Sequence, residues 1–459
     1  MKNVLEDGLP NPQRLGAILT LALGITVPVL DSSLANVALP TIARDFNASA
    51  ASSIWIVNAY QLAITVSLLS LASLGEIFGY KRVYQIGLLV FSFTSLGCAM
   101  SDSLLSLTVA RILQGFGAAA ILSVNMAMIK IIYPKKLLAR GIATGAIIVS
   151  VSASAGPTVA GIILSIASWP WLFAINLPIG IIALCMGFKY LPENPLKNPG
   201  RRFDFISSLL NALTFGLFIS AISGYAQGVN HHLILAEVVS LIIIGGFYIR
   251  RELSRPLPLL PLDLLRIPIF SLSLCTSMCS FAAYTLAFVS LPFFLQNSLR
   301  LDAGSTGLLM TAWPLATMLM APFSGRLVGR YHSGVLGGIG LLIFSSGLFA
   351  LALLPPDPAH LNIVWRMLLC GAGFGLFQSP NNHTIVSSAP SNRSGGASGL
   401  LGTARVLGQT VGAALVALMF NLFLTHGTYA SLMLAGTLAV SAAIISITRV
   451  MQKPALANI

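Results

Sequence analysis

The sequence predicts an all-α polytopic membrane protein with fourteen transmembrane helices. The first observation is composition: 56% of the 459 residues are hydrophobic, only 8% are charged, and the mean hydropathy is +0.87. Soluble domains carry about 25% charged residues, so this chain cannot form a wetted surface on all sides. The second observation is that apolar residues gather in runs of about 20, the length of a bilayer-spanning helix. The third is the uneven distribution of basic residues between these runs.

The apolar runs predict spans at 15–39, 54–75, 83–100, 104–129, 141–165, 169–190, 207–226, 233–249, 270–294, 306–328, 334–354, 362–386, 397–423 and 428–448. Two polar, turn-rich segments, 192–204 and 250–268, read as linkers. The predicted organisation is an N-terminal six-helix bundle at 1–190, linkers with two inserted helices at 191–269, and a C-terminal six-helix bundle at 270–459.

Lys and Arg fall almost entirely in alternate loops. Of the 26, the exceptions are Arg44 and Arg300 on one side, and Arg111 and Arg366 within helices. The others, with Arg405 and Arg449 counted among them, fall on the side of the two termini. Cytoplasmic loops carry this positive excess, so both termini are predicted to be cytoplasmic. The net charge of +13 thus orients the chain in the bilayer, and no nucleic-acid partner is needed to explain it.

The two outer blocks repeat each other. The segment RILQGFGAAAILSVN, which begins at Arg111, aligns its glycines with those of RMLLCGAGFGLFQSPN, which begins at Arg366. At a similar spacing, Tyr60 falls opposite Trp313. Two equivalent bundles around a site near the membrane midplane are an architecture of secondary transporters.

No motif of an enzyme is present in the sequence. HExxH, GxSxG, Walker A and CxxC are all missing, and no residue set has metal-ligand spacing. No stretch is suited to a soluble nucleotide-binding domain. We therefore expect no enzyme activity, no metal and no cofactor, and a small-molecule substrate moved across the lipid bilayer by an ion or substrate gradient.

Asp31 is the one acidic residue deep inside a predicted span. It lies roughly 12 Å from the nearer end of its helix, and Arg111 lies about 10 Å from the corresponding end of the fourth span, at ~1.5 Å per residue. Charges in membranes are costly and usually functional, so we expect the two to meet and to couple transport to protons or to bind substrate. The alternative is a purely structural ion pair that locks two helices.

Two further segments carry candidate residues. In the loop after the second span, Glu76, Gly79, Lys81 and Arg82 are predicted to form a charged clasp, a cytoplasmic gate, although Lys81 and Arg82 are also ordinary positive-inside charges. In the fifth span, small residues allow close helix packing and Pro157 removes a backbone hydrogen bond.

Polar and aromatic side chains within the spans are the candidates for a substrate cavity. A mixture of aromatic faces and a few polar groups is typical of a broad ligand site. Taken singly, each is better explained as an interhelical hydrogen bond or an interface aromatic than as a ligand contact. The candidates are Asn36, Asn58, Tyr60, Gln61, Tyr284, Trp313, Gln378, Asn381 and Asn382.

Over nearly its whole length the chain resembles the fourteen-helix drug:proton antiporter branch of the major facilitator superfamily, and within it the enterobacterial members. LDSSLANVALP resembles the first-helix signature of that branch, ARILQGFGAA its fourth-helix motif, and WPWLFAINLPIG the usual start of helix six. AGPTVAG resembles the antiporter motif of helix five through Gly156, Pro157 and Gly161. The loop after the second span departs from the family pattern, because Glu76 and Ile77 stand where Asp and Arg are usual.

The resemblance implies a major facilitator fold, two pseudo-symmetric six-helix bundles plus two extra helices, that works by alternating access. It places the proton-relay arginine of the family at Arg111, and it implies a monomeric multidrug exporter of lipophilic or cationic molecules in the bacterial inner membrane, driven by protons. Proton-coupled transport of one metabolite is the alternative, and a channel or a non-transporting receptor is a remote one.

Overall fold

A computed structural model describes residues 8–193, 203–226, 229–255, 258–390 and 393–451. The described residues form helices and contain no β-strand, and fourteen helical segments are long and apolar enough to cross a membrane. The predicted number of spans is therefore confirmed. Five of the predicted flanking charges lie outside the described residues, namely Lys2, Lys197, Arg201, Arg202 and Lys453.

The first six spans are built from eight helices. They are α1 (Gln13–Asp45), α2 (Ala50–Ser53), α3 (Trp55–Phe78), α4 (Tyr80–Ala99), α5 (Leu104–Ile132), α6 (Leu138–Ile166), α7 (Pro170–Ala174) and α8 (Asn176–Tyr190). Several run past the predicted limits: α1 continues through Pro40 to Asp45, where the hydropathy pattern had placed its end at Leu39. The helix continues past Leu39 because the residues around Pro40 are buried against other helices.

Two inserted helices and the last six spans follow. They are α9 (Phe205–Ala226), α10 (His231–Leu253), α11 (Pro268–Phe293) with the π-helical turn η3 (Phe294–Ser298), α12 (Ala303–Met310), α13 (Ala312–Leu327), α14 (Ser333–Ala352), α15 (His360–Ser388), α16 (Ser394–Leu422) and α17 (Gly427–Thr448). The predicted span 306–328 is thus two helices, α12 and α13, that meet at Thr311.

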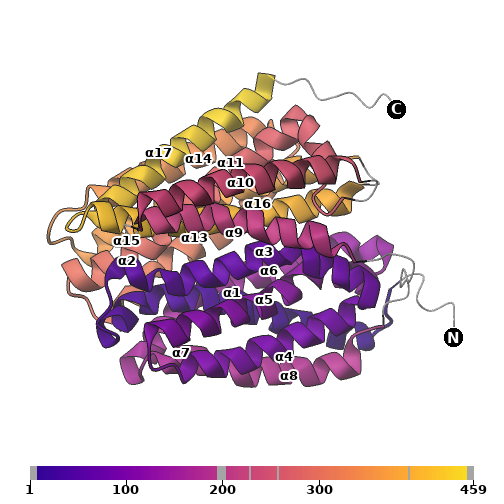
Figure 1. Cartoon of the computed structure of the whole chain (residues 1–459), viewed down its shortest axis with the longest axis horizontal. Coiled ribbons are helices and arrows are strands. Elements are labelled where there is room, and N and C mark those ends of the chain that lie inside the picture. Colours follow the sequence, from indigo (N-terminus) through magenta and orange to yellow (C-terminus); the bar gives the residue numbers. More distant parts are fainter. Residues whose placement is uncertain (1–7, 194–202, 227–228, 256–257, 391–392, 452–459) are drawn as a thin grey trace.

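The helices lie roughly parallel in two layers, with α1 to α8 in one and α11 to α17 in the other (Figure 1). We call these layers the N half and the C half. Helix α9 packs against both α3 and α16, so the inserted pair covers one side of the seam between the halves. Helix α1 begins and α17 ends at the same end of the bundle, which we call the terminus face, and the opposite end is the far face.

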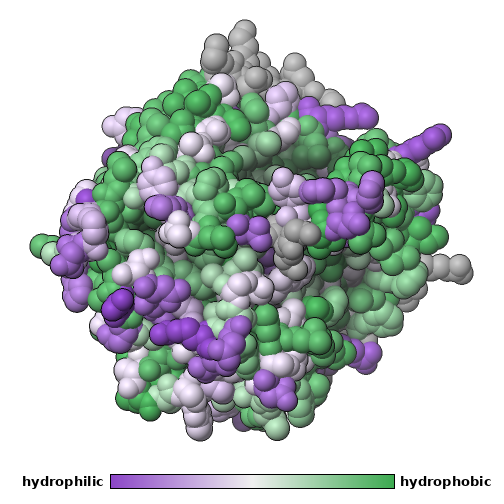
Figure 2. Space-filling model, turned by 60° about the vertical axis from the view of Figure 1, so that its left-hand side comes forward, coloured by the Kyte–Doolittle hydropathy of each residue, from purple (hydrophilic) through white to green (hydrophobic). Residues whose placement is uncertain are grey.

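The sides of the bundle are apolar. Hydrophobic residues cover much of the visible surface in Figure 2, and hydrophilic residues gather in patches on the face turned toward the viewer. Only 11% of the most apolar window of α10 is buried, against 72% for the span Ala50–Phe78. Helix α10 is therefore peripheral and presents its side chains to lipid, whereas α3 lies inside the bundle.

The glycine motifs of the sequence repeat make equivalent contacts in the two halves. A Cβ on Gly117 would lie 2.6 Å from the Phe91 nitrogen, and one on Gly373 would lie 2.3 Å from the Phe344 nitrogen. Helix α5 therefore touches the backbone of α4 in the way that α15 touches the backbone of α14, as the repeat predicts. Only glycine allows such close approach of two helix backbones.

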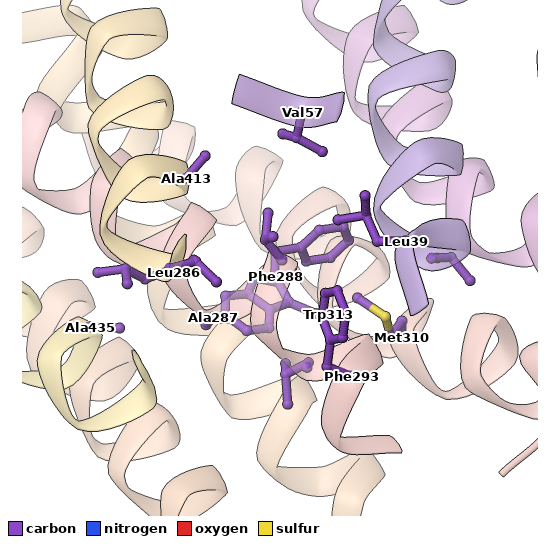
Figure 3. Close-up of a cluster of buried hydrophobic side chains, with 14 of the residues drawn as sticks. Leu39, Val57, Leu286, Ala287, Phe288, Phe293, Met310, Trp313, Ala413 and Ala435 are labelled. Atoms are coloured by element: carbon purple, nitrogen blue, oxygen red, sulfur yellow. The ribbon is translucent and has the colours of Figure 1, made fainter. Parts of the chain in front are cut away.

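The two halves share one hydrophobic core near the far face. Figure 3 shows Leu39 and Val57 of the N half facing Phe288, Met310 and Trp313 of the C half. The Phe288 and Trp313 rings meet edge to face, with centroids 6.0 Å apart, an arrangement that aromatic pairs favour.

Polar contacts close the same end. Gln296 of η3 donates a hydrogen bond to the Val37 carbonyl of α1 at 2.9 Å and accepts one from Thr41 at 3.2 Å. The N half and the C half are therefore in contact at the far face.

Candidate functional site

The structure brings Asp31 and Arg111 together in the interior of the N half. Arg111 Nη1 donates to Asp31 Oδ2, and both side chains are only 1% exposed. Arg111 Nε donates to the Ile56 carbonyl at 3.2 Å, and the guanidinium carbon lies 4.0 Å from the centroid of the Tyr60 ring. The pairing expected from matched depths is therefore present, as a buried ion pair packed on an aromatic face.

Asp31 accepts hydrogen bonds from three side chains on two other helices, Arg111 and Gln114 of α5 and Asn176 of α8. Asn176 Nδ2 donates to Asp31 Oδ1 at 2.7 Å, and Gln114 Nε2 donates to the same oxygen at 3.1 Å. Gln114 Oε1 in turn accepts a bond from Arg111 at 2.6 Å. All three partners donate to the carboxyl group, and hydrogen bonds to an ionised group are stronger than bonds between neutral groups.

Gln114 and Asn176 are functional candidates that the sequence reasoning did not name. Both sit in segments that it did single out: Gln114 lies one helical turn after Arg111, and Asn176 lies in WPWLFAINLPIG. Helical periodicity places Gln114 on the face of Arg111. Nothing in the sequence places Asn176, because its contact depends on how α8 packs beside α1.

The candidate gate loop joins α3 and α4 at the terminus face. Gly79 has a φ of +105°, a conformation that favours glycine. Lys81 forms an ion pair with Glu193 at 3.5 Å, and Arg82 is exposed. The predicted clasp is therefore tied to the end of the sixth span through Lys81, a contact that the sequence did not suggest.

The candidate antiporter motif packs helix α6 on both halves. A Cβ on Gly156 would lie 2.2 Å from Ser33 Cβ of α1, and one on Gly161 would lie 2.7 Å from the Gly304 carbonyl oxygen of α12. The Thr158 and Thr311 hydroxyls are hydrogen-bonded at 2.6 Å across the same contact. In this structure the motif thus seals the seam toward the far face.

The nine candidate cavity residues do not form one site. Tyr60 belongs to the Asp31 cluster, Trp313 and Tyr284 to the aromatic core, and Asn381 to a cluster around Arg449. The remainder, Asn36, Asn58, Gln61, Gln378 and Asn382, lie along α1, α3 and α15. Among the described residues, neither amide atom of Asn58 has a hydrogen-bond partner. The nine candidates thus lie on helices of both halves and take part in at least three separate sets of contacts.

A cavity of about 440 Å³ lies instead at the far face, among the ends of α11, α14 and α16 and the start of α17. Of the described residues that line it, none is among the nine candidates. Tyr429, His426 and Phe294 are among those that do line it. No local pattern in the sequence predicts this cavity, because loops and helix ends from both halves form it.

Two arginines counted as flanking charges lie inside the protein. Arg449 is 1% exposed and donates to Ser273 Oγ at 2.8 Å and to Asn381 Oδ1 at 2.7 Å. Arg405 lies well within α16, so its assignment to the terminus-side loops was wrong. The sequence does not tell whether these two side chains face inward. Helix rotation decides which side chains do.

Comparison with known proteins identifies the family. The sequence profile of the Major Facilitator Superfamily matches residues 21–413. The chain belongs to the major facilitator superfamily. It is a membrane transporter, and the predicted fold class and the resemblance are confirmed.

Curated members of the superfamily match over most of their length. The chain is 61% identical over 452 residues to the uncharacterized transporter YebQ of Escherichia coli (strain K12), covering 98% of this chain and 99% of that protein. It is 30% identical to the riboflavin transporter RibZ of Clostridioides difficile (strain 630), over 90% of both chains. It is also 30% identical to the multidrug resistance protein Stp of Mycobacterium tuberculosis (strain CDC 1551 / Oshkosh), covering 88% of this chain and 76% of that protein.

Solved structures of this superfamily share the fold at low identity. A POT family transporter in complex with a thioalcohol-conjugated peptide has a TM-score of 0.72 at 14% identity and covers 95% of both chains. A D-xylose–proton symporter has a TM-score of 0.68 at 13% identity, covering 94% of this chain and 97% of that one. At such identities the likeness concerns the fold alone.

Proposed function

We propose that this major facilitator transporter is a proton-driven exporter of lipophilic or cationic small molecules that works by alternating access. The observation that carries the proposal is the buried Asp31–Arg111 pair with its surrounding donors. Relatives named as multidrug resistance and multidrug efflux proteins support export of drug-like molecules. The proton gradient supplies the energy, with no cofactor and no second subunit.

Protonation of Asp31 would change the energy of this cluster strongly. Breaking a buried ion pair by neutralising one partner costs about 3–5 kcal/mol, because the other charge stays buried without compensation. The new O–H of Asp31 would also need an acceptor, while Asn176 and Gln114 would donate to a neutral oxygen in place of a charged one. A conformation in which Arg111 gains a new partner is then favoured, which is how proton binding selects one of two facing states.

The orientation follows from the basic residues. Lys81, Lys130, Arg250, Arg326 and Lys136 lie at the terminus face, and the positive-inside tendency places that face in the cytoplasm. We propose residence in the bacterial inner membrane with both termini cytoplasmic. With the halves joined at the far face, access to the seam would be from the cytoplasm. The N half, the inserted pair and the C half would move as the three predicted units, 1–190, 191–269 and 270–459.

The test is transport by Asp31→Asn in proteoliposomes. We expect this variant to lose uptake driven by an imposed pH gradient and to keep substrate counterflow, which requires no net proton movement. Glu237→Gln is the matched control: Glu237 is also an acid within a span, but it bonds Ser220 in the peripheral pair. Proton coupling that survives in a folded Asp31→Asn protein would refute the assignment. Counterflow separates this result from misfolding.

Transport of one metabolite is the second candidate function. The observation that favours it is the 30% identity to a protein named as a riboflavin transporter. A panel of chemically diverse substrates, measured with a pH-sensitive dye inside proteoliposomes, separates the two functions. A multidrug exporter responds to several chemical classes, and a metabolite carrier responds to one.

A further inference from the structure

Arg405 is a cation in the middle of a membrane-spanning helix. It lies roughly 16 Å from the start of α16 at ~1.5 Å per residue, about 40% of the way along the helix. Its side chain is half-buried, and it forms neither a hydrogen bond nor an ion pair with any residue that the structure describes. Guanidinium has five donors, and charges at this depth are normally paired.

The other arginines inside the bundle have polar partners. Arg111 is neutralised by Asp31, Arg449 bonds Ser273 and Asn381, and Arg366 donates to the Ala350 carbonyl. The two acids well inside the described spans are already engaged, Asp31 by Arg111 and Glu237 by Ser220. Away from the span ends, then, no acid among the described residues remains to neutralise Arg405.

Aromatic side chains flank Arg405. Its guanidinium carbon lies 5.2 Å from the centroid of the Phe281 ring on α11. One turn further along α11, the Tyr284 ring lies 5.1 Å from the Phe374 ring, and its hydroxyl forms no hydrogen bond with a described residue. An arginine with no polar partner among the described residues thus contacts an aromatic ring of α11, and the Tyr284 hydroxyl lies one helical turn from that ring in the chain.

This group of residues lies on the seam between the halves. Helix α16 packs against α11 of its own half and against α3 of the other, where Thr410 and Thr65 are hydrogen-bonded at 2.9 Å. Arg405 precedes Thr410 by about one and a half turns. Substrate sites of transporters built from two repeats lie near the midplane at this interface.

We propose that Arg405 binds the anionic group of the transported substrate, with Phe281 and Tyr284 holding its aromatic part. The substrate class is a lipophilic aromatic carboxylate, whose two oxygens match the planar fork of a guanidinium. The assignment rests on the proposed export function, and among lipophilic substrates it selects anions in place of cations. It gives the Arg405 guanidinium, which has no polar partner among the described residues, a ligand to bind.

Binding to the purified protein in phosphatidylcholine nanodiscs tests the assignment without any gradient. The probes are 2-naphthoate and its neutral counterpart 2-naphthamide, measured by calorimetry. Wild type is expected to bind the carboxylate at least tenfold more tightly than the amide. Arg405→Gln should remove this preference, Arg405→Lys should keep part of it, and Tyr284→Phe should weaken binding severalfold. Arg326→Gln, which removes an exposed arginine of α13, is the matched control.

A second measurement separates binding from a structural role. Because Arg405 has no ion pair or hydrogen bond with a described residue to lose, Arg405→Met should leave the thermal unfolding midpoint unchanged or raise it, whereas a structural arginine would give a lower midpoint. Equal binding of the two probes to wild type, or a preference that survives in Arg405→Gln, would overturn the proposal. So would displacement of 2-naphthoate by phosphatidylglycerol, which assigns the site to a lipid headgroup.

The outcome is distinguishable from failure of the proposed export function. Asp31→Asn, which tests proton coupling, is expected to bind 2-naphthoate as wild type does, because Asp31 contacts Arg111 rather than Arg405. Loss of coupling with intact carboxylate binding supports both assignments. Intact coupling with no carboxylate preference refutes the role of Arg405 alone.

Discussion

Replacing Gly307 by alanine should force the two halves apart at the far face. A Cβ at this position would lie 2.3 Å from the Pro157 carbonyl oxygen of α6 and 2.7 Å from the Gly161 Cα. Carbon and oxygen atoms approach to about 3.3–3.6 Å at closest, so the backbones of α6 and α12 must separate by roughly 1 Å. Because the clashing atoms belong to helix backbones, no side-chain rotation can relieve the contact.

The magnitude follows from the cost of overpacking. Inserting a methyl group into a packed interior costs about 1–3 kcal/mol. The gain of helix propensity from Gly to Ala, about 1 kcal/mol, is the same in both facing states and does not change their ratio. The clash exists only where α6 touches α12. The ratio of the observed state to a state open at the far face should therefore fall by roughly 5–150-fold.

Labelling of an introduced cysteine measures this shift, with the buried Cys98 and Cys370 left in place. Thr158→Cys places a thiol at the contact with Thr311, in a protein whose Cys185, Cys275 and Cys279 are replaced by serine. Reaction with a polar maleimide should accelerate in Gly307→Ala. The matched control is Gly216→Ala in α9, where a Cβ meets nothing within 4 Å. Unchanged labelling of a folded Gly307→Ala protein would refute the role of this contact in closing the far face.

Two further predictions concern the inserted pair. Asn211 is fully buried and donates to the Val66 carbonyl of α3 at 3.0 Å, so Asn211→Ala should destabilise the protein by about 1–3 kcal/mol, measured by thermal unfolding beside the variant Asn421→Ala of an exposed asparagine. Asp204, just before α9, is partly desolvated, which raises its pKa, but the bonds from Ser207 and Arg251 outweigh this and leave the pKa below its ordinary value. Its ion pair therefore stabilises the folded state above the unfolded pKa and loses this effect as pH falls through the lower folded pKa. The free energy of unfolding of wild type should exceed that of Asp204→Asn by about 1 kcal/mol or less. This difference should persist down to about pH 5 and shrink below about pH 3.9. A difference that grows on acidification would contradict the reasoning.

Much of the site could be predicted because it depends on local signals. Asp31 and Arg111 stand out as charges inside apolar runs, and their depths follow from the rise of a helix. Gln114 lies one turn from Arg111 and shares its face. Asn176 was missed because its bond to Asp31 depends on the packing of α8 beside α1, which no local pattern encodes.

The positions of Arg405 and Arg449 mark the limit of reasoning from hydropathy. Both are charged residues that a window average assigns to the nearest span end. A helix can turn such a residue toward lipid, water or a neighbouring helix without any change in that average. Arg449 turns toward Ser273 and Asn381, and Arg405 turns toward Phe281.

The sequence by itself determined the number of spans, the repeat and the family, because a bilayer requires each crossing segment to be apolar over about 20 residues and that requirement is local. Only the tertiary structure decided which polar side chains meet. In the folded protein Asn176 donates a hydrogen bond to Asp31, and Gly161 packs against the Gly304 backbone. Arg405 lies over the Phe281 ring and forms no ion pair with a described acid. These outcomes depend on the rotation and approach of helices far apart in the chain, since a hydrogen bond or a clash is decided within about 1 Å.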